Sequence, residues 1–209
     1  MDIRGTLAAH AHLVAAVAAL TDEQVVAASL LPGWTVGHVL AHLARNAESH
    51  VAMLRAANAG QVGVQYPGGA AQRTRDIDAG ASRSAAEQVA DLIATNAQLE
   101  AAWAAMTEAG WNGQGQSALG AVAMHELPFR RWRETVVHHA DLGLGYTWHD
   151  WPGDYVRLEL TRMTMLWSSR QPMGLTTLPA AAVVLPDHER LAWLMGRTEV
   201  TGLAAAGIL

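Results

Sequence analysis

The stretch Arg131–Gly143, RWRETVVHHADLG, carries side chains that can bind a metal ion. Glu134 and His138 stand four residues apart, and His139 and Asp141 follow closely. Side chains four residues apart on an α-helix lie on the same face, about 6 Å from each other. One divalent ion could therefore take a carboxylate oxygen and an imidazole nitrogen from this helix. Two ligands rarely hold a catalytic metal, so a third should come from another part of the chain.

The expected source of the third ligand is Gly33–Asn46, GWTVGHVLAHLARN, in which His38 and His42 again stand four residues apart. At about 100° per residue, the apolar residues of this helix define a buried stripe. His42 lies at the edge of that stripe, His38 lies a further step towards solvent, and His50 lies within it. A single histidine is more often a hydrogen-bonded core or boundary residue than a ligand. His42 is favoured because Asn46 follows one turn later and extends a polar strip along the helix.

The alternative for Glu134 and His138 is an exposed pair that adds a few tenths of a kcal/mol to the helix. Apolar residues on the opposite face would turn Glu134 outwards: Phe129, Trp132 and Val136. Apolar residues also flank the Glu134 face: Leu127, Val137 and Leu142. We therefore expect a buried helix, in which the carboxylate needs a partner. The competitors of a metal for that role are three arginines: Arg130, Arg131 and Arg133.

The composition narrows the class of protein. The chain has 209 residues, of which 51% are hydrophobic, and it contains no cysteine. Alanine is abundant while Phe and Tyr are scarce, which favours helices over sheets. Without cysteine the protein has no disulfides, thiolate ligands or thiol nucleophile of its own. The net charge of −5 and the lack of a basic cluster argue against a nucleic-acid partner.

The sequence shows no membrane span and no signal peptide, so we expect a cytoplasmic protein.

Helix-forming segments occupy most of the chain. Hydrophobic spacing and capping residues predict helices over residues 5–19, 22–29, 35–57, 84–106 and 153–169. A further helix is expected over the Glu134 and His138 stretch, with Pro128 in its first turn or at a kink and Leu142-Gly143 at its end. Long helices joined by loops predict an antiparallel bundle with a site in its core. Residues 61–81 are expected to be a long Gly-rich connection, and residues 110–115 a loop. The tail contains a short β-like run, AAAVVL, and a short helix from Asp187.

Several of these segments together resemble the mycothiol-dependent maleylpyruvate isomerase family, a branch of the DinB-like metal-binding four-helix bundles. The resembling pieces are, in order, Gly33-Trp34-Thr35, His38 and His42 with Asn46, Arg75-Asp76-Ile77, and Arg131-x-Arg133-Glu134-x-x-x-His138-His139-x-Asp141-Leu142-Gly143. They extend over about residues 5–170. The resemblance implies a mainly α protein: a DinB-like antiparallel four-helix bundle at 1–170, followed by a short α/β C-terminal extension at 171–209.

The resemblance also implies a set of metal ligands. These are His42, Glu134 and His138, which would bind Zn²⁺ or a similar divalent metal and leave positions open for a thiolate or water. Other matching residues would line the cofactor pocket or hold the ligands in place: His38, Asn46 and Asp141.

The cofactor implied by the family is mycothiol or another small thiol, which the metal would make more acidic so that it attacks an electrophilic small molecule. The partners are then a thiol and an electrophilic substrate, with a homodimer as a possible assembly. A Gly-Arg motif in the family's C-terminal region implies that Arg197, in WLMGR, binds an anionic substrate group. The alternative is an arginine that lies near the carbonyls at its own helix end. The region after residue 170 is shorter than in full-length isomerases.

Three functions remain open from the sequence. The first is an isomerase of maleylpyruvate type or a thiol S-transferase. The second is a non-catalytic DinB-like metal-binding protein, such as a sensor or stress protein. The third is a metal-dependent hydrolase, which needs the same three ligands and a water. An open coordination position beside a polar pocket would favour the first or the third.

Overall fold

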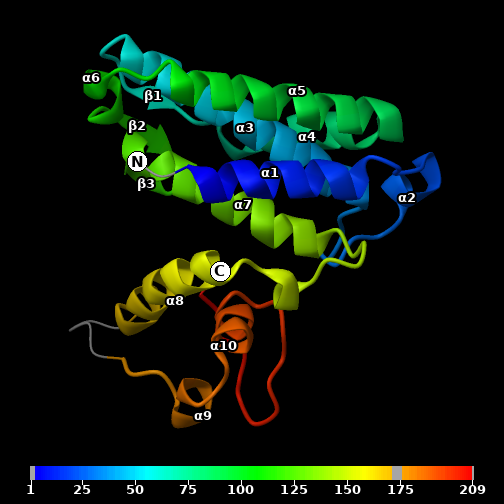
Figure 1. Cartoon of the computed structure of the whole chain (residues 1–209), viewed down its shortest axis with the longest axis vertical. Coiled ribbons are helices and arrows are strands. Elements are labelled where there is room, and N and C mark those ends of the chain that lie inside the picture. Colours follow the sequence, from blue (N-terminus) through cyan, green and yellow to red (C-terminus); the bar gives the residue numbers. More distant parts are fainter. Residues whose placement is uncertain (1–2, 171–175, 209) are drawn as a thin grey trace. The chain divides into compact units, whose positions relative to one another are not determined.

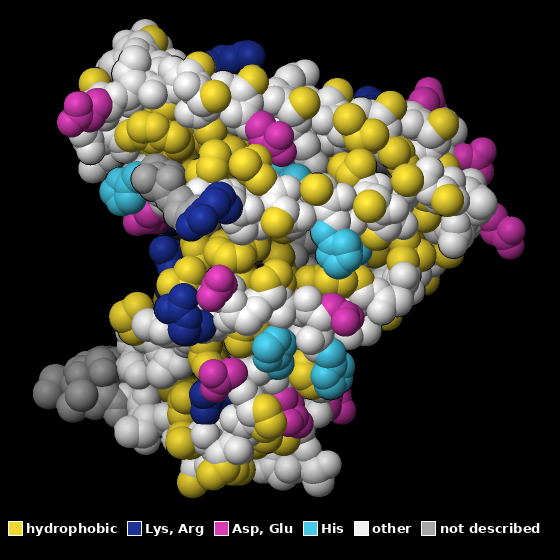
Figure 2. Space-filling view, in the orientation of Figure 1, with side chains coloured by type: hydrophobic (Ala, Val, Ile, Leu, Met, Phe, Trp, Pro, Cys, Tyr) yellow, Lys and Arg dark blue, Asp and Glu magenta, His cyan; other side chains and the backbone are white. Residues whose placement is uncertain are grey.

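The computed structural model describes residues 3–170 and 176–208, and the chain forms two compact units, Met1–Leu144 and Gly145–Leu209 (Figure 1). No helix within these described ranges is long and apolar enough to cross a membrane. On the face shown in Figure 2, basic and acidic side chains lie interspersed among hydrophobic and other groups.

The first unit is built on four long helices: α1 (Arg4–Val17), α3 (Val36–Asn58), α5 (Ala85–Ala104) and α7 (Leu127–Asp141). Helix α3 packs against α5 and α7, while α1 packs against α7 and α5 (Figure 1). The expected mainly α, DinB-like four-helix bundle is confirmed. The expected helix starts are also present, because Thr35 and Ser84 each form a capping box at the beginning of α3 and α5.

Smaller elements complete the first unit. They are two short helices, α2 (Asp22–Val26) and α6 (Glu108–Trp111), the 3₁₀ turn η1 (Met124–Glu126), and three strands, β1 (Gly63–Val64), β2 (Gln114–Ser117) and β3 (Gly120–Ala123). The strand order is β1-β2-β3, with β1 parallel to β2 and β2 antiparallel to β3. This small sheet corrects the expectation of a plain loop at residues 110–115. Its strands are too short and too rich in Gly and Gln to show an alternating pattern.

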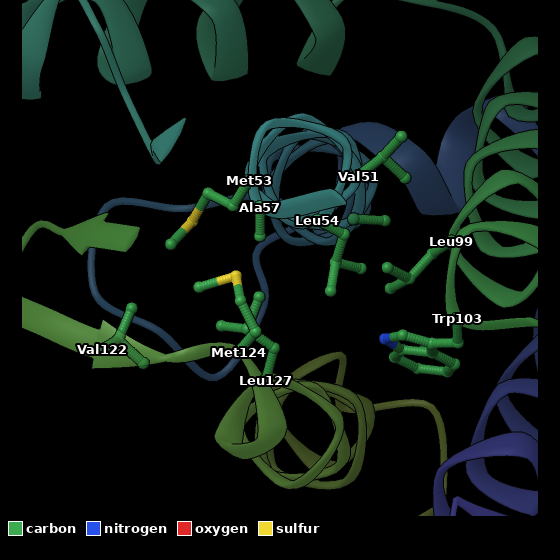
Figure 3. Close-up of a cluster of buried hydrophobic side chains, with 10 residues drawn as sticks. Val51, Met53, Leu54, Ala57, Leu99, Trp103, Val122, Met124 and Leu127 are labelled. Carbon is green, nitrogen blue, oxygen red and sulfur yellow. The ribbon is translucent and has the colours of Figure 1, made fainter. Parts of the chain in front are cut away.

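Hydrophobic side chains from several elements meet at one end of the bundle. Figure 3 shows Leu54 from α3 facing Leu99 and Trp103 from α5, with Met124 from η1 and Leu127 from the start of α7 beside them. Each of these five side chains is at most 3% exposed. Full burial of such a side chain contributes about 1.5–3 kcal/mol, so this cluster fixes where α7 begins relative to α3.

Residues 61–81 are not the loop that the glycines suggested. They contain α4 (Gly69–Ala81), which packs along α3. The helix comes close because its contact residues are small: a Cβ added at Gly80 would lie 2.8 Å from Ala41 Cβ. Ile77 is 2% exposed and supplies the apolar contact on the same face. The glycine therefore serves helix packing rather than a flexible connection.

The second unit holds the 3₁₀ turn η2 (Trp148–Asp150) and helices α8 (Gly153–Ser168), α9 (Ala180–Val183) and α10 (Asp187–Leu194). Helix α8 packs on α10 through buried aromatic residues, with the Trp167 and Trp193 rings 5.2 Å apart between centroids. The boundary between the two units thus lies before α8, whereas the family resemblance implied a domain boundary after residue 170. The β-like run AAAVVL was misread, because Ala180–Val183 is a short helix that follows Pro179.

Candidate metal centre

The structure brings the three proposed ligands together inside the first unit. His42 extends from α3, while Glu134 and His138 extend from one face of α7. His42 Nε2 lies 2.8 Å from Glu134 Oε2, and His138 Nε2 lies 3.5 Å from the same oxygen. One ligand atom from each residue lies within 4.8 Å of the other two. The i,i+4 spacing on α7 and the position of His42 at the edge of the apolar stripe of α3 therefore place the three side chains next to one another.

This donor set suits a divalent metal. Two imidazole nitrogens and one carboxylate oxygen are ligands found in catalytic zinc sites, where three protein ligands leave a position for water or substrate. Burial lowers the pKa of His42 to about 4, although its contact with Glu134 acts in the opposite direction. His42 is therefore a neutral imidazole at pH 7, with a lone pair available for a metal.

The charge on Glu134 is also preserved. Burial alone would raise the pKa of this carboxyl, but the hydrogen bonds to His138 and His42 outweigh burial and hold the pKa well below its usual value. An ionised carboxylate between two imidazoles attracts a cation more strongly than a neutral acid would.

Asp141 orients the second histidine. Its Oδ2 lies 2.8 Å from His138 Nδ1, and the residue is 2% exposed. The carboxylate accepts from Nδ1–H, which leaves Nε2 directed at Glu134. Burial lowers the pKa of His138, but the hydrogen bonds and charges of Asp141 and Glu134 dominate and raise it to about 8. Asp141, predicted as a pocket or supporting residue, is thus placed directly behind a candidate ligand.

His42 has a different neighbour at its second ring nitrogen. Arg73 Nη2, from α4, lies 3.0 Å from His42 Nδ1. The Trp34 ring also packs near His42, with 5.7 Å between centroids. Sequence reasoning missed Arg73 because it read residues 61–81 as a loop. The apolar residues Ile77 and Ala81, four residues apart in that stretch, are a weak sequence sign of a helix, and they do not by themselves place Arg73 next to His42.

A cavity of about 670 Å³ opens beside His42 and Glu134. Its lining includes polar and cationic side chains from α3, α4, α7 and the sheet region: Asn46, His50, Gln65, Tyr66, Arg73, Gln116, Ser117, Arg130 and Arg133. A cavity of this size, with apolar walls and several polar groups, can hold a small molecule next to the three candidate ligands. The three arginines give this space a positive character.

The other predicted pocket residues have different surroundings. Asn46 is 3% exposed and lines the cavity, and its Oδ1 accepts from Arg131 Nη1 at 2.9 Å. His38 is not among the described residues that line the cavity. Its Nδ1 lies 2.8 Å from Thr35 Oγ1 in the capping box of α3, and its Nε2 lies 3.8 Å from Asp78. A direct role of His38 in the pocket stays a prediction.

Beneath the site, Arg131 is fully buried and held by neutral groups. Its guanidinium donates to His10 Nε2, to the Leu43 and Asn46 oxygens, and to Asn96 Oδ1, over 2.7–3.1 Å. Burial lowers its pKa to about 10, so it stays charged at neutral pH. Arg131, which stands three residues before Glu134, therefore links α7 to α1, α3 and α5 through hydrogen bonds. From the sequence, Arg131 was expected as a possible partner of Glu134, and its contacts with three other helices were not expected.

Arg197 lies in the second unit, directly after α10. Its Nη1 donates to the Met195 carbonyl at 2.7 Å, a short-range contact near its own helix end. The role of Arg197 in binding an anionic substrate group stays a prediction.

Residues 6–143 match the family model of the mycothiol maleylpyruvate isomerase N-terminal domain. The chain belongs to this family. The match covers more than half of the sequence and ends at the boundary of the first compact unit. The family resemblance carried by the His, Glu and Gly-Trp-Thr motifs is therefore confirmed.

Two solved structures are similar to this chain in fold. A histidine-to-alanine variant of the mycothiol-dependent maleylpyruvate isomerase is 25% identical, with a TM-score of 0.75 over 80% of this chain and 70% of that chain. A second crystal structure of the mycothiol-dependent maleylpyruvate isomerase is 23% identical, with a TM-score of 0.82 over 94% and 88%. The second comparison shows a shared fold that extends beyond the bundle. No curated protein matches the sequence significantly.

Proposed function

We propose that this family member is a metal-dependent enzyme that uses an external small thiol, mycothiol or a similar compound, on an electrophilic substrate. The observation that carries the proposal is the convergence of His42, Glu134 and His138 beside a cavity of about 670 Å³. The donor atoms of these three side chains would hold Zn²⁺ or a similar divalent ion. A bound ion of this kind supplies positive charge that lowers the pKa of a thiol beside it.

The chain itself supplies the surroundings of that thiol. Asp141 holds His138 in the orientation a ligand needs, and the arginines of the cavity attract anions. The chain contains no cysteine, so the nucleophilic sulfur must belong to a bound molecule. The cavity beside the ligands provides room for one.

The reaction type that we favour is isomerisation of a maleylpyruvate-like compound. A thiol bound beside the metal would supply a nucleophile for reversible addition to the conjugated double bond, with the electron pair delocalised into the neighbouring carbonyl. The resulting single bond could rotate, and release of the thiol would give the trans double bond with no thiol consumed. In a thiol S-transferase the new C–S bond would be kept and the neighbouring carbon would take up a proton.

A catalytic role fits better than a purely structural metal. Structural zinc sites are usually closed by four protein ligands, whereas three side chains converge here among the residues that the structure describes. The cavity next to them combines apolar walls with charged side chains such as Arg73 and Arg133, which suits the binding of a small substrate.

The test is metal binding in matched variants. We expect the purified protein to bind about one Zn²⁺ per chain, as a single three-ligand site predicts. His42→Ala should abolish this binding because it removes a ligand. His38→Ala, one turn earlier on α3, should retain it.

Zinc content and a competition titration with a chromogenic chelator measure the effect. If His42→Ala keeps the wild-type zinc affinity, the ligand assignment is wrong. Turnover of maleylpyruvate with mycothiol, against conjugation of other electrophiles, then separates the isomerase from the S-transferase.

A further inference from the structure

The contact between Arg73 and His42 fixes which ring nitrogen of His42 carries hydrogen. A guanidinium has only N–H donors, so His42 Nδ1, 3.0 Å from Arg73 Nη2, must act as the acceptor. A neutral imidazole then carries its hydrogen on Nε2. This Nε2–H points at Glu134 Oε2, 2.8 Å away, and completes a consistent hydrogen-bond chain from Arg73 through His42 to Glu134.

That arrangement cannot persist when His42 binds a metal through Nε2. Coordination needs the Nε2 lone pair, so the hydrogen of the neutral ring must lie on Nδ1. Nδ1–H would then face the N–H of Arg73 across a distance that suits only a donor and an acceptor. His138 differs, because its Nδ1 already faces the acceptor Asp141. Metal binding therefore leaves the Asp141 contact intact and breaks the Arg73 contact.

The cavity gives the Arg73 guanidinium room to move away from His42. Arg73 is half-buried and lines the cavity, and its guanidinium carbon lies 5.9 Å from the centre of the Tyr66 ring. A second arginine of the lining, Arg130, has a carboxylate partner, with Nη2 at 3.1 Å from Glu126 Oε2. Arg73 instead has a candidate metal ligand as its hydrogen-bond partner, so metal loading frees its donors for another acceptor.

We propose that Arg73 is a metal-gated anion-binding residue of this cavity. In the metal-free protein it donates to His42 Nδ1. When His42 holds the metal, the guanidinium is released and binds a carboxylate of the substrate through its planar fork of donors. This inference rests on the proposed function, because it requires a metal on His42. It makes metal and anion binding mutually reinforcing, by the same factor in each direction.

Zinc titrations of three proteins test the coupling: the wild type, Arg73→Gln and Arg130→Gln. Both variants lose one positive charge from the same cavity, but only Arg73 contacts His42. Without an added anion, Arg73→Gln should bind Zn²⁺ about 10-fold more tightly than Arg130→Gln, because the amide oxygen of Gln can accept from Nδ1–H. Saturating succinate, used as an unreactive dicarboxylate, should tighten Zn²⁺ binding to the wild type by about 10-fold. In Arg73→Gln this succinate effect should largely disappear.

The hydrogen position on His42 gives a second readout that does not depend on activity. Side-chain ¹⁵N NMR should show the Nε2–H form in the metal-free wild type and the Nδ1–H form after Zn²⁺ is added. An Nδ1–H form before metal is added would overturn the inference, as would an unchanged succinate effect in Arg73→Gln. Failure of the wild type to bind Zn²⁺ would overturn the proposed function as well. Zinc binding without the Arg73 dependence would overturn the inference alone.

Discussion

The two candidate histidine ligands are prepared for metal to different degrees. His138 has an acidic acceptor, Asp141, behind it, whereas His42 has a cationic donor, Arg73. The first contact increases the basicity of the ring nitrogen that faces the metal, and the second must be broken before the ring can bind. If both histidines bind the proposed metal, His138 would keep its Asp141 contact and lose a proton, whereas His42 would lose its Arg73 contact.

The hydrogen bond between Asp141 and His138 Nδ1 leads to a prediction. Asp141→Asn keeps the size of the side chain and removes the negative charge next to His138 Nδ1. We expect Zn²⁺ affinity to fall about 10-fold, which is typical when a group supporting a metal-bound histidine is altered. Competition with a chromogenic chelator measures the change. Asp78→Asn is the control, because this 62% exposed carboxylate lies 3.8 Å from His38 rather than from a ligand. Equal losses in both variants would argue against a specific role for Asp141.

Residue spacing alone predicts part of this centre. Helical geometry predicts that Glu134 and His138 share one face and that His42 lies beside the apolar stripe, whereas the choice of these three as ligands comes from the family resemblance. Arg73 is not predictable from residue spacing, because its contact with His42 depends on how α4 packs on α3. The buried Arg131 is also hard to predict. Its hydrogen-bond partners come from three helices far apart in the sequence, and charged residues are seldom fully buried.

At the scale of elements, α4 shows how a helix can resemble a loop in sequence. Its residues GAAQRTRDIDAGA are mostly small or polar, and a strong apolar stripe is absent from them. The helix is stable because its small residues allow close packing on α3. The opposite error occurs at AAAVVL, where β-branched residues suggest a strand but the backbone forms the short helix α9. Local preference is overridden by tertiary contacts in both cases.

The close packing of α4 on α3 can be tested at Gly80. An added Cβ would lie 2.8 Å from Ala41 Cβ, so Gly80→Ala must push the two helices apart. We expect a loss of about 1–3 kcal/mol in the free energy of unfolding, as for other overpacked cores. Denaturant unfolding followed by circular dichroism measures it.

The control for Gly80 is Gly153→Ala at the start of α8. A Cβ there meets no atom within 4 Å, so this variant reports the general effect of replacing glycine by alanine. That general effect is neutral or stabilising by less than about 1 kcal/mol where the backbone permits alanine. A Gly80→Ala protein as stable as the wild type would show that α3 and α4 can separate without cost.

At the scale of the whole molecule, buried histidines make stability depend on pH. His10 and His50 are each 2% exposed, and burial, with a further contribution from Arg131, lowers each pKa to about 3. The unfolded chain takes up these protons below pH 6.5, whereas the folded protein does so only near pH 3. The stability that comes with the neutral rings is therefore present above pH 6.5 and is lost as the pH falls towards 3. The slope is about 1.4 kcal/mol per pH unit for each histidine.

Removing one of the two histidines should reduce this slope. In His10→Gln the amide can still accept from Arg131 and donate to Glu100, the two partners of the imidazole. We expect the slope of the unfolding free energy against pH, between pH 6 and pH 4, to decrease by about 1.4 kcal/mol per pH unit, which corresponds to one fewer proton taken up on unfolding. Urea titrations at several pH values measure this slope. The control is His12→Gln, at an exposed position of the same helix. An unchanged slope in His10→Gln would contradict the prediction.

The last prediction concerns what the second unit adds to the first. The family match and the candidate ligands lie within residues 1–144, so metal binding should not depend on Arg197. If Arg197 binds a carboxylate, Arg197→Ala should raise KM for a carboxylate substrate about 10-fold or more, because a charge-assisted pair of hydrogen bonds is lost. Zinc content and the unfolding midpoint should stay at wild-type values. Arg157→Ala is the matched control, since this 69% exposed arginine of the same unit pairs with Asp154. A wild-type KM in Arg197→Ala would assign Arg197 to its contact with the Met195 carbonyl and leave Arg73 as the arginine that recognises the substrate.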